Sequence, residues 1–354
     1  MKKILNLFAI LFLGIWNSTL SQTYLVQVKP TGSDTWGYAN LKGELIIPAK
    51  YQKCSEFSKE GVATIYDKDN KKFYIINLKG ETLTTEISDF RLQLTYITDV
   101  PNKFEDGMIG VCQSKKWGYF NSEGKVAIPI KYDKVIYFDG GFGAAEIDGK
   151  WLILDKKGTE YPVNLAGINY INHFTESLAP FTMEDKKMGF LDEKGQVAIE
   201  AKFTALGFFS DGLAWARDIS DKIGFIDKKG EWIIKPQFDV ARNFDSEAGL
   251  ARVKLNGVWG YVNKNGDILY VKESTTFDDF FNGLAQGEIK DKKRGYYNNK
   301  GEWAIQPQFD DERDFKNNYA AVKKDGKWGL IDKEGKWIIQ PVFDGIRDVI
   351  LIEK

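Results

Sequence analysis

Few side chains in this 354-residue sequence could carry out nucleophilic or acid–base chemistry. There is one histidine, His173, and it lies in a connecting stretch between more regular segments. A nucleophile needs a base held beside it, and no such partner is visible near His173. Paired carboxylates occur at Asp278-Asp279 and Asp310-Asp311, but each pair follows a phenylalanine near the end of a repeated unit, which favours a turn or a solvated edge. We therefore predict no catalytic residues and no enzyme.

Metal ions and cofactors are not indicated either. Turns such as Asp155–Gly158 and Asp227–Gly230 begin with an acidic residue, but calcium needs six or more oxygen ligands, and the lysines inside these turns would repel a cation. A phosphate-binding loop and a Cys/His metal motif are both absent. The two cysteines, Cys54 and Cys112, occupy non-equivalent positions two units apart, so we expect no disulfide bond between them.

Aromatic side chains are the remaining candidates for a binding site. Most tryptophans recur at two fixed positions of a repeat, which predicts that they fill the core between units. One set is Trp36, Trp117, Trp151, Trp259 and Trp328, and the other is Trp232, Trp303 and Trp337. Trp215 belongs to neither set, and Tyr96 lies in an irregular insertion at Thr84–Asn102. Trp215 and Tyr96 are therefore the predicted surface aromatics that could bind a ligand.

The elements that position these residues are copies of one phrase, seen most clearly in Gly249–Asp267. Aligned on the Gly of a Trp-Gly step, or on the residue that replaces it, nine copies follow one another at intervals of 34 to 44 residues. The aligned residues are Gly37, Tyr74, Gly118, Leu152, Gly189, Gly224, Gly260, Gly295 and Gly329. Repetition at this period is typical of tandem-repeat architectures. A larger residue at Tyr74 and Leu152 predicts looser packing of the second and fourth units.

Each unit is predicted to contain three antiparallel strands. In Leu250–Leu255 apolar and polar residues alternate, as in a half-buried strand, and Asn256-Gly257 then favours a two-residue hairpin turn. The Trp-Gly strand follows and ends in an [Asp/Asn]-x-x-Gly turn. The third strand, as in Glu231–Asp239, contains a proline in six copies, so it should bend or leave the sheet there.

The composition and the first residues of the chain narrow the range of functions that the protein could have. The chain has 49 Lys and Arg residues against 50 Asp and Glu residues, which disfavours a nucleic-acid partner. Its first residues, Met1-Lys2-Lys3 and then an apolar run at Ile4–Ile15, predict a signal peptide at residues 1–21, because the run is too short to span a bilayer. We expect an exported protein, periplasmic, in the cell envelope or secreted, with no stable membrane span after cleavage.

The phrases GKWGLIDKEG (Gly326–Gly335) and WIIQPVFD (Trp337–Asp344) resemble the bacterial WG, or KWG, β-repeat family. The resemblance covers the chain from about Gln22 to Asp344. It implies an all-β repeat protein of a kind that is usually of unassigned function and presumed to mediate interactions. It implies no catalytic residues.

The sequence thus predicts a signal peptide at 1–21 and an all-β array of about nine three-stranded antiparallel units at 22–354. An open, elongated or superhelical arrangement is the first expectation, because the units are short and nine exceeds the usual number of blades; a closed β-propeller is the alternative. The predicted function is a non-enzymatic module that binds another protein or acts as a scaffold. The alternative is a module that binds carbohydrate or a cell-envelope polysaccharide, and a hydrolase with a site in Thr84–Asn102 or Asn164–Pro180 is the third possibility.

Overall fold

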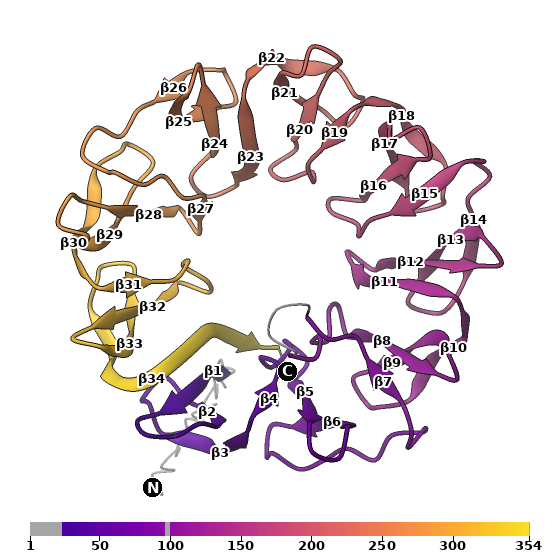
Figure 1. The fold of residues 1–354 in the computed structure, drawn as a ribbon, viewed down its shortest axis with the longest axis horizontal. Coiled ribbons are helices and arrows are strands. Elements are labelled where there is room, and N and C mark those ends of the chain that lie inside the picture. Colours follow the sequence, from indigo (N-terminus) through magenta and orange to yellow (C-terminus); the bar gives the residue numbers. More distant parts are fainter. Residues whose placement is uncertain (1–22, 96–99, 354) are drawn as a thin grey trace, which may run out of the picture.

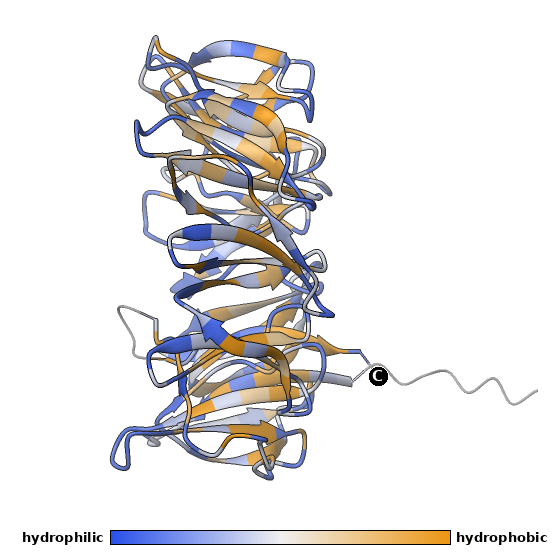
Figure 2. Ribbon diagram, turned by 90° about the vertical axis from the view of Figure 1, so that its right-hand side faces the viewer, coloured by the Kyte–Doolittle hydropathy of each residue, from blue (hydrophilic) through white to orange (hydrophobic). Residues whose placement is uncertain are grey.

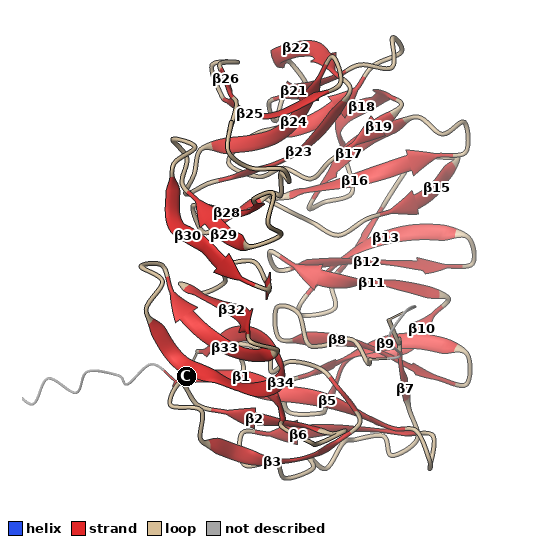
Figure 3. Ribbon diagram, turned by 60° about the vertical axis from the view of Figure 1, so that its left-hand side comes forward, coloured by secondary structure: helices blue, strands red, loops and turns tan. Residues whose placement is uncertain are grey.

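The computed structural model describes residues 23–95 and 100–353, and every structural statement below concerns these residues. The predicted signal peptide at 1–21 lies outside them. Their regular structure consists of strands, with no helix (Figure 3). Accordingly, none of the described residues form a helix that could cross a membrane. Small sheets follow one another around a ring, with the two ends of the described chain meeting on one side of it (Figure 1).

The predicted nine units are confirmed, and we number them 1 to 9 from the copy at Gly37 to the copy at Gly329. Seven complete or nearly complete sheets belong to single units, and one seven-stranded sheet joins units 9 and 1 through the long strand β34 (Trp337–Ile352). Within a unit the strands lie side by side in chain order, each antiparallel to the next. The chain enters a unit at the inner edge of the ring and leaves it at the outer edge (Figure 1).

The strands of equivalent position have the following bounds. The inner strands are β4 (Lys53–Cys54), β7 (Arg91–Leu92), β11 (Lys134–Asp139), β15 (Ile168–Ile171), β19 (Ala205–Leu206), β23 (Val240–Asp245), β27 (Phe280–Phe281), β31 (Asp311–Glu312) and the C-terminal part of β34. The second strands are β1 (Thr23–Pro30), β5 (Val62–Asp67), β8 (Met108–Gln113), β12 (Phe142–Ile147), β16 (Leu178–Met183), β20 (Ala214–Arg217), β24 (Leu250–Leu255), β28 (Leu284–Glu288) and β32 (Tyr319–Lys324).

The third and outermost strands complete the units. The third, Trp-Gly strands are β2 (Trp36–Ala39), β6 (Lys72–Asn77), β9 (Lys116–Asn121), β13 (Lys150–Asp155), β17 (Met188–Asp192), β21 (Ile223–Ile226), β25 (Val258–Asn263), β29 (Arg294–Tyr297) and β33 (Lys327–Asp332). The outermost strands are β3 (Leu45–Tyr51), β10 (Val126–Tyr132), β14 (Glu160–Pro162), β18 (Val197–Phe203), β22 (Trp232–Phe238), β26 (Ile268–Leu269), β30 (Trp303–Phe309) and the first part of β34.

The units have four strands where three were predicted. The extra strand is the connecting segment, which pairs with the second strand of the following unit; Val240 in β23, for example, faces Lys254 in β24. Unit 2 is the exception, because β4, β5 and β6 form a three-stranded sheet and only an isolated bridge, Ile76–Thr82, marks the fourth position. Connections that double as strands explain how units of about 35 residues build four-stranded sheets.

In place of an open array, the ring is closed, which was the alternative arrangement. Strand β1 pairs antiparallel with the C-terminal part of β34, so that Val26 faces Val349. Unit 1 therefore takes its inner strand from the C-terminus and its other three strands from the N-terminus. Each chain end covers the sheet edge that the other would leave exposed, and an exposed edge is a site for aggregation.

The core lies between the units. Nine clusters of buried side chains fill the nine contacts between neighbouring units, one per contact. The cluster that joins units 9 and 1 is of the same kind as the rest and contains Val28, Leu330 and Ile346. Seen from the side, the ring is a disc with many hydrophilic turns along its two faces and hydrophobic residues on the strands between them (Figure 2). Each unit thus depends on both neighbours, as expected for a repeat protein.

The glycine of the Trp-Gly step lets two strands approach closely. A Cβ atom on Gly224 would lie 2.3 Å from the carbonyl oxygen of Ile234 on β22, and five other aligned glycines would meet a carbonyl oxygen at 2.4–2.6 Å. Beyond this point the outermost strands contain the predicted prolines, and their pairing shows the predicted irregularity, as between Ile223 and Phe225 on β21. Where Tyr74 replaces the glycine, unit 2 has no outermost strand, and where Leu152 replaces it, the outermost strand β14 has three residues.

Candidate functional site

Two recurring contacts hold inner strands in place in several units. Lys222 Nζ lies 2.6 Å from Asp239, whose other oxygen accepts the N–H of Gly257 in the next hairpin turn at 3.0 Å. The same arrangement recurs in three further units, at Lys116–Asp133, Lys293–Asp310 and Lys327–Asp344. The lysine before the Trp-Gly step thus anchors the start of the following inner strand.

The second contact is made by a tyrosine that follows the Trp-Gly or Arg-Gly step. Its hydroxyl donates to an inner-strand carbonyl of the next unit, as from Tyr261 to Asp278 at 2.7 Å. Tyr38, Tyr119 and Tyr296 make the same bond to the residue seventeen positions later. The residue after each of these carbonyls is therefore held at a fixed place on the inner edge of the ring.

We call the residues at this place the inner wall. Each directly precedes a buried residue, which is phenylalanine in eight units and Val349 in unit 1. In order from unit 1, the inner wall consists of Asp348, Glu56, Lys103, Tyr137, His173, Phe208, Asn243, Asp279 and Asp314. All nine are partly or fully exposed.

One arc of the inner wall, in units 4 to 6, is aromatic. His173 is stacked between Tyr137 and Phe208, with ring centroids 4.6 and 4.1 Å away. Burial lowers the pKa of His173 to about 4, so its ring is neutral at pH 7. Its Nδ1 lies 2.9 Å from Oδ1 of Asn172, and no carboxylate is within hydrogen-bonding distance among the described residues. The histidine therefore packs as an aromatic ring.

The opposite arc, in units 8, 9, 1 and 2, carries carboxylates, each contacted from the preceding unit. Asp279 is ion-paired with Arg252, whose Nε lies 2.8 Å from Oδ1, Asp314 accepts a hydrogen bond from Gln286 Nε2 at 2.6 Å, and Asp348 is ion-paired with Lys316. Glu56 accepts the backbone N–H of Asp348 at 3.3 Å. Burial, together with the nearby charge of Asp348, raises the pKa of Asp314 to about 6. Burial likewise raises the pKa values of Glu56 and Asp279.

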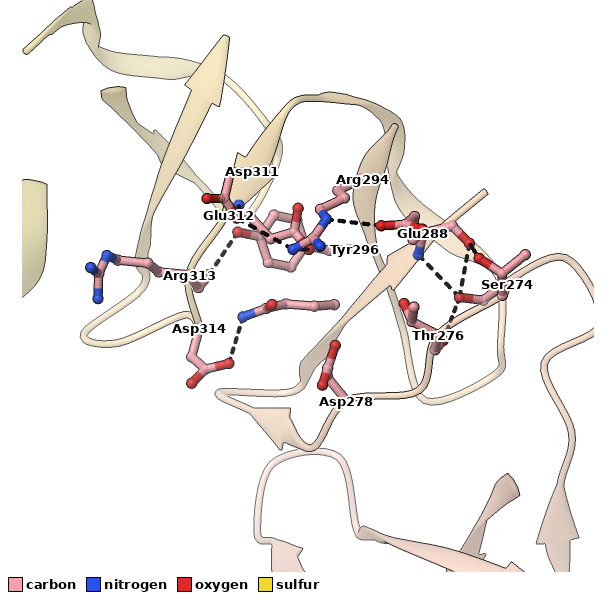
Figure 4. Close-up of polar contacts among 12 residues, drawn as sticks. Ser274, Thr276, Asp278, Glu288, Arg294, Tyr296, Asp311, Glu312, Arg313 and Asp314 are labelled. Carbon is pink, nitrogen blue, oxygen red and sulfur yellow. Dashed lines mark hydrogen bonds and ion pairs between the residues drawn. The ribbon is translucent and has the colours of Figure 1, made fainter. Parts of the chain in front are cut away.

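Behind this arc, units 8 and 9 share a buried polar cluster (Figure 4). Arg294 stands where most units have the tryptophan of the Trp-Gly step, and its guanidinium contacts Glu288 at 3.1 Å and Asp311 at 3.3 Å. Glu312, 8% exposed, occupies the position of Ala241 in unit 7. Its Oε2 has no hydrogen-bond partner, and burial raises its pKa to about 9. The predicted acid pairs Asp278-Asp279 and Asp310-Asp311 are tied to Arg252, Lys293 and Arg294, which gives them structural roles.

The predicted ligand-binding aromatics are not brought together. Trp215, in β20, is half-buried against the cluster between units 6 and 7, and its indole lies over Gly207, where an added Cβ would be 2.1 Å from Nε1. Tyr96 lies outside the described residues. Leu94 and Pro101, which lie on either side of it within the insertion at Thr84–Asn102, form an isolated β-bridge. A ligand role for either residue stays a prediction.

The other residues singled out in the sequence have structural roles. Six of the eight tryptophans in the two repeat positions belong to clusters between units, and Trp151 is buried, which agrees with the predicted core role. Cys54 and Cys112 are free, as predicted. In the turns with acidic first residues, Asp227 Oδ1 accepts the N–H groups of Lys229 and Glu231, which explains the aspartate without a metal. No group of metal-ligating side chains is present among the described residues.

Sequence reasoning missed the inner wall. Five connecting segments contain a recurring phenylalanine, and the inner-wall residue is the one directly before it, at Phe104, Phe138, Phe244, Phe280 and Phe315. Its side chain differs from unit to unit, so it leaves no repeated letter in the sequence. The signal that could have found it is a variable position inside an otherwise fixed phrase.

The fold and the recurring contacts between units together define the class of protein. It is a closed ring of small antiparallel β-sheets built from one repeat, which is a β-propeller arrangement. The family "WG containing repeat" matches residues 36–71, 117–151, 188–219, 223–259, 295–328 and 328–349, more than half of the chain. The chain therefore belongs to the WG-repeat family, as the resemblance implied.

Comparisons with other known proteins give information about the fold and not about the function. A search of curated proteins found no significant match. The crystal structure of a eukaryotic initiation factor is similar with a TM-score of 0.60 and 9% sequence identity, covering 94% of this chain and 98% of that one. The designed protein Ika8 matches with a TM-score of 0.43 and 12% identity, covering 80% of this chain and 93% of its own. AztD from Citrobacter koseri matches with a TM-score of 0.44 and 11% identity, covering 94% and 99%.

Proposed function

We propose that this chain is an exported, non-enzymatic interaction module that binds another protein through the inner wall of its ring. One observation carries the proposal. The residues of the Trp-Gly steps and of the turns recur from unit to unit. The inner wall, in contrast, holds seven residue types in nine units. A packing position is constrained by similar neighbours in every unit, so a position that varies inside a fixed framework is free to serve recognition.

The separation of the inner wall into an aromatic arc and a carboxylate arc supports a protein partner. Aromatic side chains are enriched in protein interfaces, and complementary charges orient the partners. Here Tyr137, 42% exposed, stands in the aromatic arc, and Asp279, Asp314, Asp348 and Glu56 form the carboxylate arc. A partner with an apolar segment on one side and basic groups on the other would complement both arcs.

A polysaccharide is the second candidate. Sugars pack on the free faces of aromatic rings, but the rings of Tyr137, His173 and Phe208 are stacked on one another at interplanar angles of 26° and 29°. Tyr170, 42% exposed beside Trp151, is the side chain that favours this alternative. It lies with Tyr137 in the lining of one surface hollow in units 3 to 5.

Site-specific photocrosslinking in the native host tests the proposal. A benzoyl-phenylalanine at Asn243, between the two arcs, should give an adduct that protease digests, whereas the same group at Tyr270, exposed at the outer side of unit 7, should give none. Equal adducts at both positions, or none at Asn243, would contradict an inner-wall site. A protease-resistant adduct that contains sugar would favour the polysaccharide.

Export is tested separately by sequencing the N-terminus of the protein recovered from cell fractions. A mature chain that begins at Gln22 and is found outside the cytoplasm is expected. Uncleaved protein that remains in the cytoplasm would contradict export without bearing on the inner wall.

A further inference from the structure

A cavity of about 440 Å³ opens at the inner edge of the ring where the two ends of the chain meet. Its lining comes from units 1 to 4 and includes Trp36 on β2, Glu56 after β4, Tyr137 on β11 and Arg347 on β34. This volume is in the range of small-molecule sites. Unit 1 contributes side chains from both the N-terminal and the C-terminal parts of the chain, so the cavity exists only in the closed ring.

The cavity contains a cationic group that nothing in the described chain neutralises directly. The guanidinium of Arg347 lies over the indole of Trp36, 5.3 Å from the ring centroid. It makes no hydrogen bond and no ion pair within 4 Å to any described residue. Burial lowers the pKa of Arg347, and the charge of Arg313 in the neighbouring unit lowers it further. A half-buried guanidinium with free N–H donors is costly to leave unpaired, because charged groups lose hydration on burial.

The other charged residues of the lining are already engaged. Lys103 Nζ lies 3.5 Å from Glu105, and Glu56 accepts a backbone N–H from Asp348. The amide nitrogen of Gln27 donates to the carbonyl oxygen and the sulfur of Cys54. Arg347 is therefore the charged group of the described lining whose hydrogen-bonding capacity is left over.

We propose that this cavity binds a small monocarboxylate, with Arg347 holding the carboxylate and the rings of Trp36 and Tyr137 bordering its apolar part. The planar guanidinium matches a carboxylate in a two-bond fork, and stacking on Trp36 fixes the plane of that fork in advance. The indole and phenol rings offer the apolar area that most small-ligand sites have.

The surrounding charges favour one negative charge over two. Glu56 and Asp348 both act electrostatically on Arg347. Both kinds of anion are repelled by these two carboxylates, but a phosphate monoester, with a charge near −2 at pH 7, is repelled about twice as strongly as a monocarboxylate, which balances the single positive charge of Arg347. We therefore assign the site to carboxylates among the anions that a guanidinium can bind.

The cavity shares Glu56, Lys103 and Tyr137 with the inner wall, but Arg347 and Trp36, which would hold the carboxylate, do not belong to it, so binding of a carboxylate is tested apart from the protein partner proposed above. Ligand binding at this cavity should also affect the stability of the closed ring. A ligand that binds only the closed form stabilises that form in proportion to its concentration relative to its dissociation constant. Bound carboxylate should therefore raise the melting temperature of the protein.

Ligand-observed NMR and thermal unfolding of the mature protein with three related probes test the proposal. Benzoate should bind and raise the melting temperature, whereas the neutral isostere benzamide should bind at least about tenfold more weakly, because a charge-assisted hydrogen bond is lost. Phenyl phosphate should bind more weakly than benzoate. The substitution Arg347→Gln should abolish the preference for benzoate over benzamide.

Arg313→Gln is the matched control. Arg313 occupies the equivalent position in unit 9 and lies over Trp328 at 5.7 Å, but it does not line the cavity. Benzoate binding that survives Arg313→Gln and fails in Arg347→Gln supports the site. No binding of benzoate to the unsubstituted protein, equal binding of benzamide, tighter binding of phenyl phosphate, or unchanged binding in Arg347→Gln would each overturn it. If Arg347→Gln does not fold, the comparison of the three probes still decides.

Discussion

Arg294 Nη1 lies 3.8 Å from Oε1 of Glu312, beyond hydrogen-bonding distance, while Oε2 of the same carboxyl is buried without a partner (Figure 4). In units 1, 3, 7 and 9 the position of Arg294 is tryptophan, as at Trp259, and in unit 7 the position of Glu312 is Ala241. Two apolar positions of the repeat are thus replaced together by groups of opposite charge. Arg294 makes its shorter contacts with Glu288 and Asp311, so Glu312 keeps only the 3.8 Å contact and its Oε2 has no hydrogen-bond partner.

The first prediction concerns the pH dependence that Glu312 creates. Burial raises its pKa from 4.5 to about 9, so the folded protein keeps a proton that the unfolded chain releases above pH 4.5. The contribution of Glu312 to wild-type stability should therefore fall as pH rises from about 4.5 to about 9. In Glu312→Gln this fall should be absent, giving a variant about 1–3 kcal/mol more stable at pH 9, the usual cost of an unsatisfied buried polar group.

Chemical denaturation at a series of pH values measures this difference. Glu288→Gln is the control, because Glu288 is paired with Arg294 Nε at 3.1 Å and its loss should not make the protein more stable at high pH. Parallel stability curves for Glu312→Gln and the wild type would contradict a protonated buried Glu312.

His173 should have the opposite pH signature. Burial lowers its pKa from 6.5 to about 4, so between these values the unfolded chain binds a proton that the folded protein excludes. Stability should fall as pH drops from about 6.5 to 4, by at most about 3 kcal/mol from this group. His173→Phe keeps the stack between Tyr137 and Phe208 and should remove most of that loss, as measured by unfolding at pH 7 and pH 4.5. An equally acid-sensitive variant would show that other groups are responsible.

The repeat itself could be predicted because it is local. In Gly326–Gly335 the turn residues, the Trp-Gly step and the strand pattern lie within ten residues, and the same phrase recurs at nine places. The fourth strand could not, since a two-residue strand such as Asp311–Glu312 has no periodicity to detect. The pairing of β1 with the C-terminal part of β34 could not be predicted either, because it depends on the curvature summed over nine units, which no local pattern encodes.

The inner wall and the cavity were hidden from the sequence for the same reason. Tyr137, His173 and Phe208 are separated by 36 and 35 residues and meet only because the units stack in register. Arg347 and Trp36 lie near opposite ends of the chain and meet only through ring closure. Their chemistry follows from tertiary placement, and no residue near either of them in the sequence signals it.

The glycine of the Trp-Gly step should tolerate a methyl group in proportion to the space beside it. At Gly224 a Cβ would lie 2.3 Å from a carbonyl oxygen of β22, whereas at Gly260 the nearest atom, also a carbonyl oxygen, is 3.0 Å away. Gly224→Ala should therefore cost about 1–3 kcal/mol, the range for overpacking, and Gly260→Ala less. Thermal unfolding of the two variants compares them directly. A larger loss for Gly260→Ala would contradict the close-approach explanation.

Closure of the ring is tested at Val349, which faces Val26 across the junction of the terminal strands and is 1% exposed. A charge buried in the cluster between units 9 and 1 is costly, so Val349→Asp should destabilise the closed ring by several kcal/mol. Val258→Asp, at a position that is 54% exposed, is the matched control and should have little effect. In small-angle X-ray scattering the wild type should give a ring-like distance distribution with a radius of gyration near that of a compact chain. Val349→Asp should give a larger radius or an unfolded profile. A wild-type profile typical of a rod, or a Val349→Asp profile identical to that of the wild type, would show that the terminal strands do not hold the ring closed in solution.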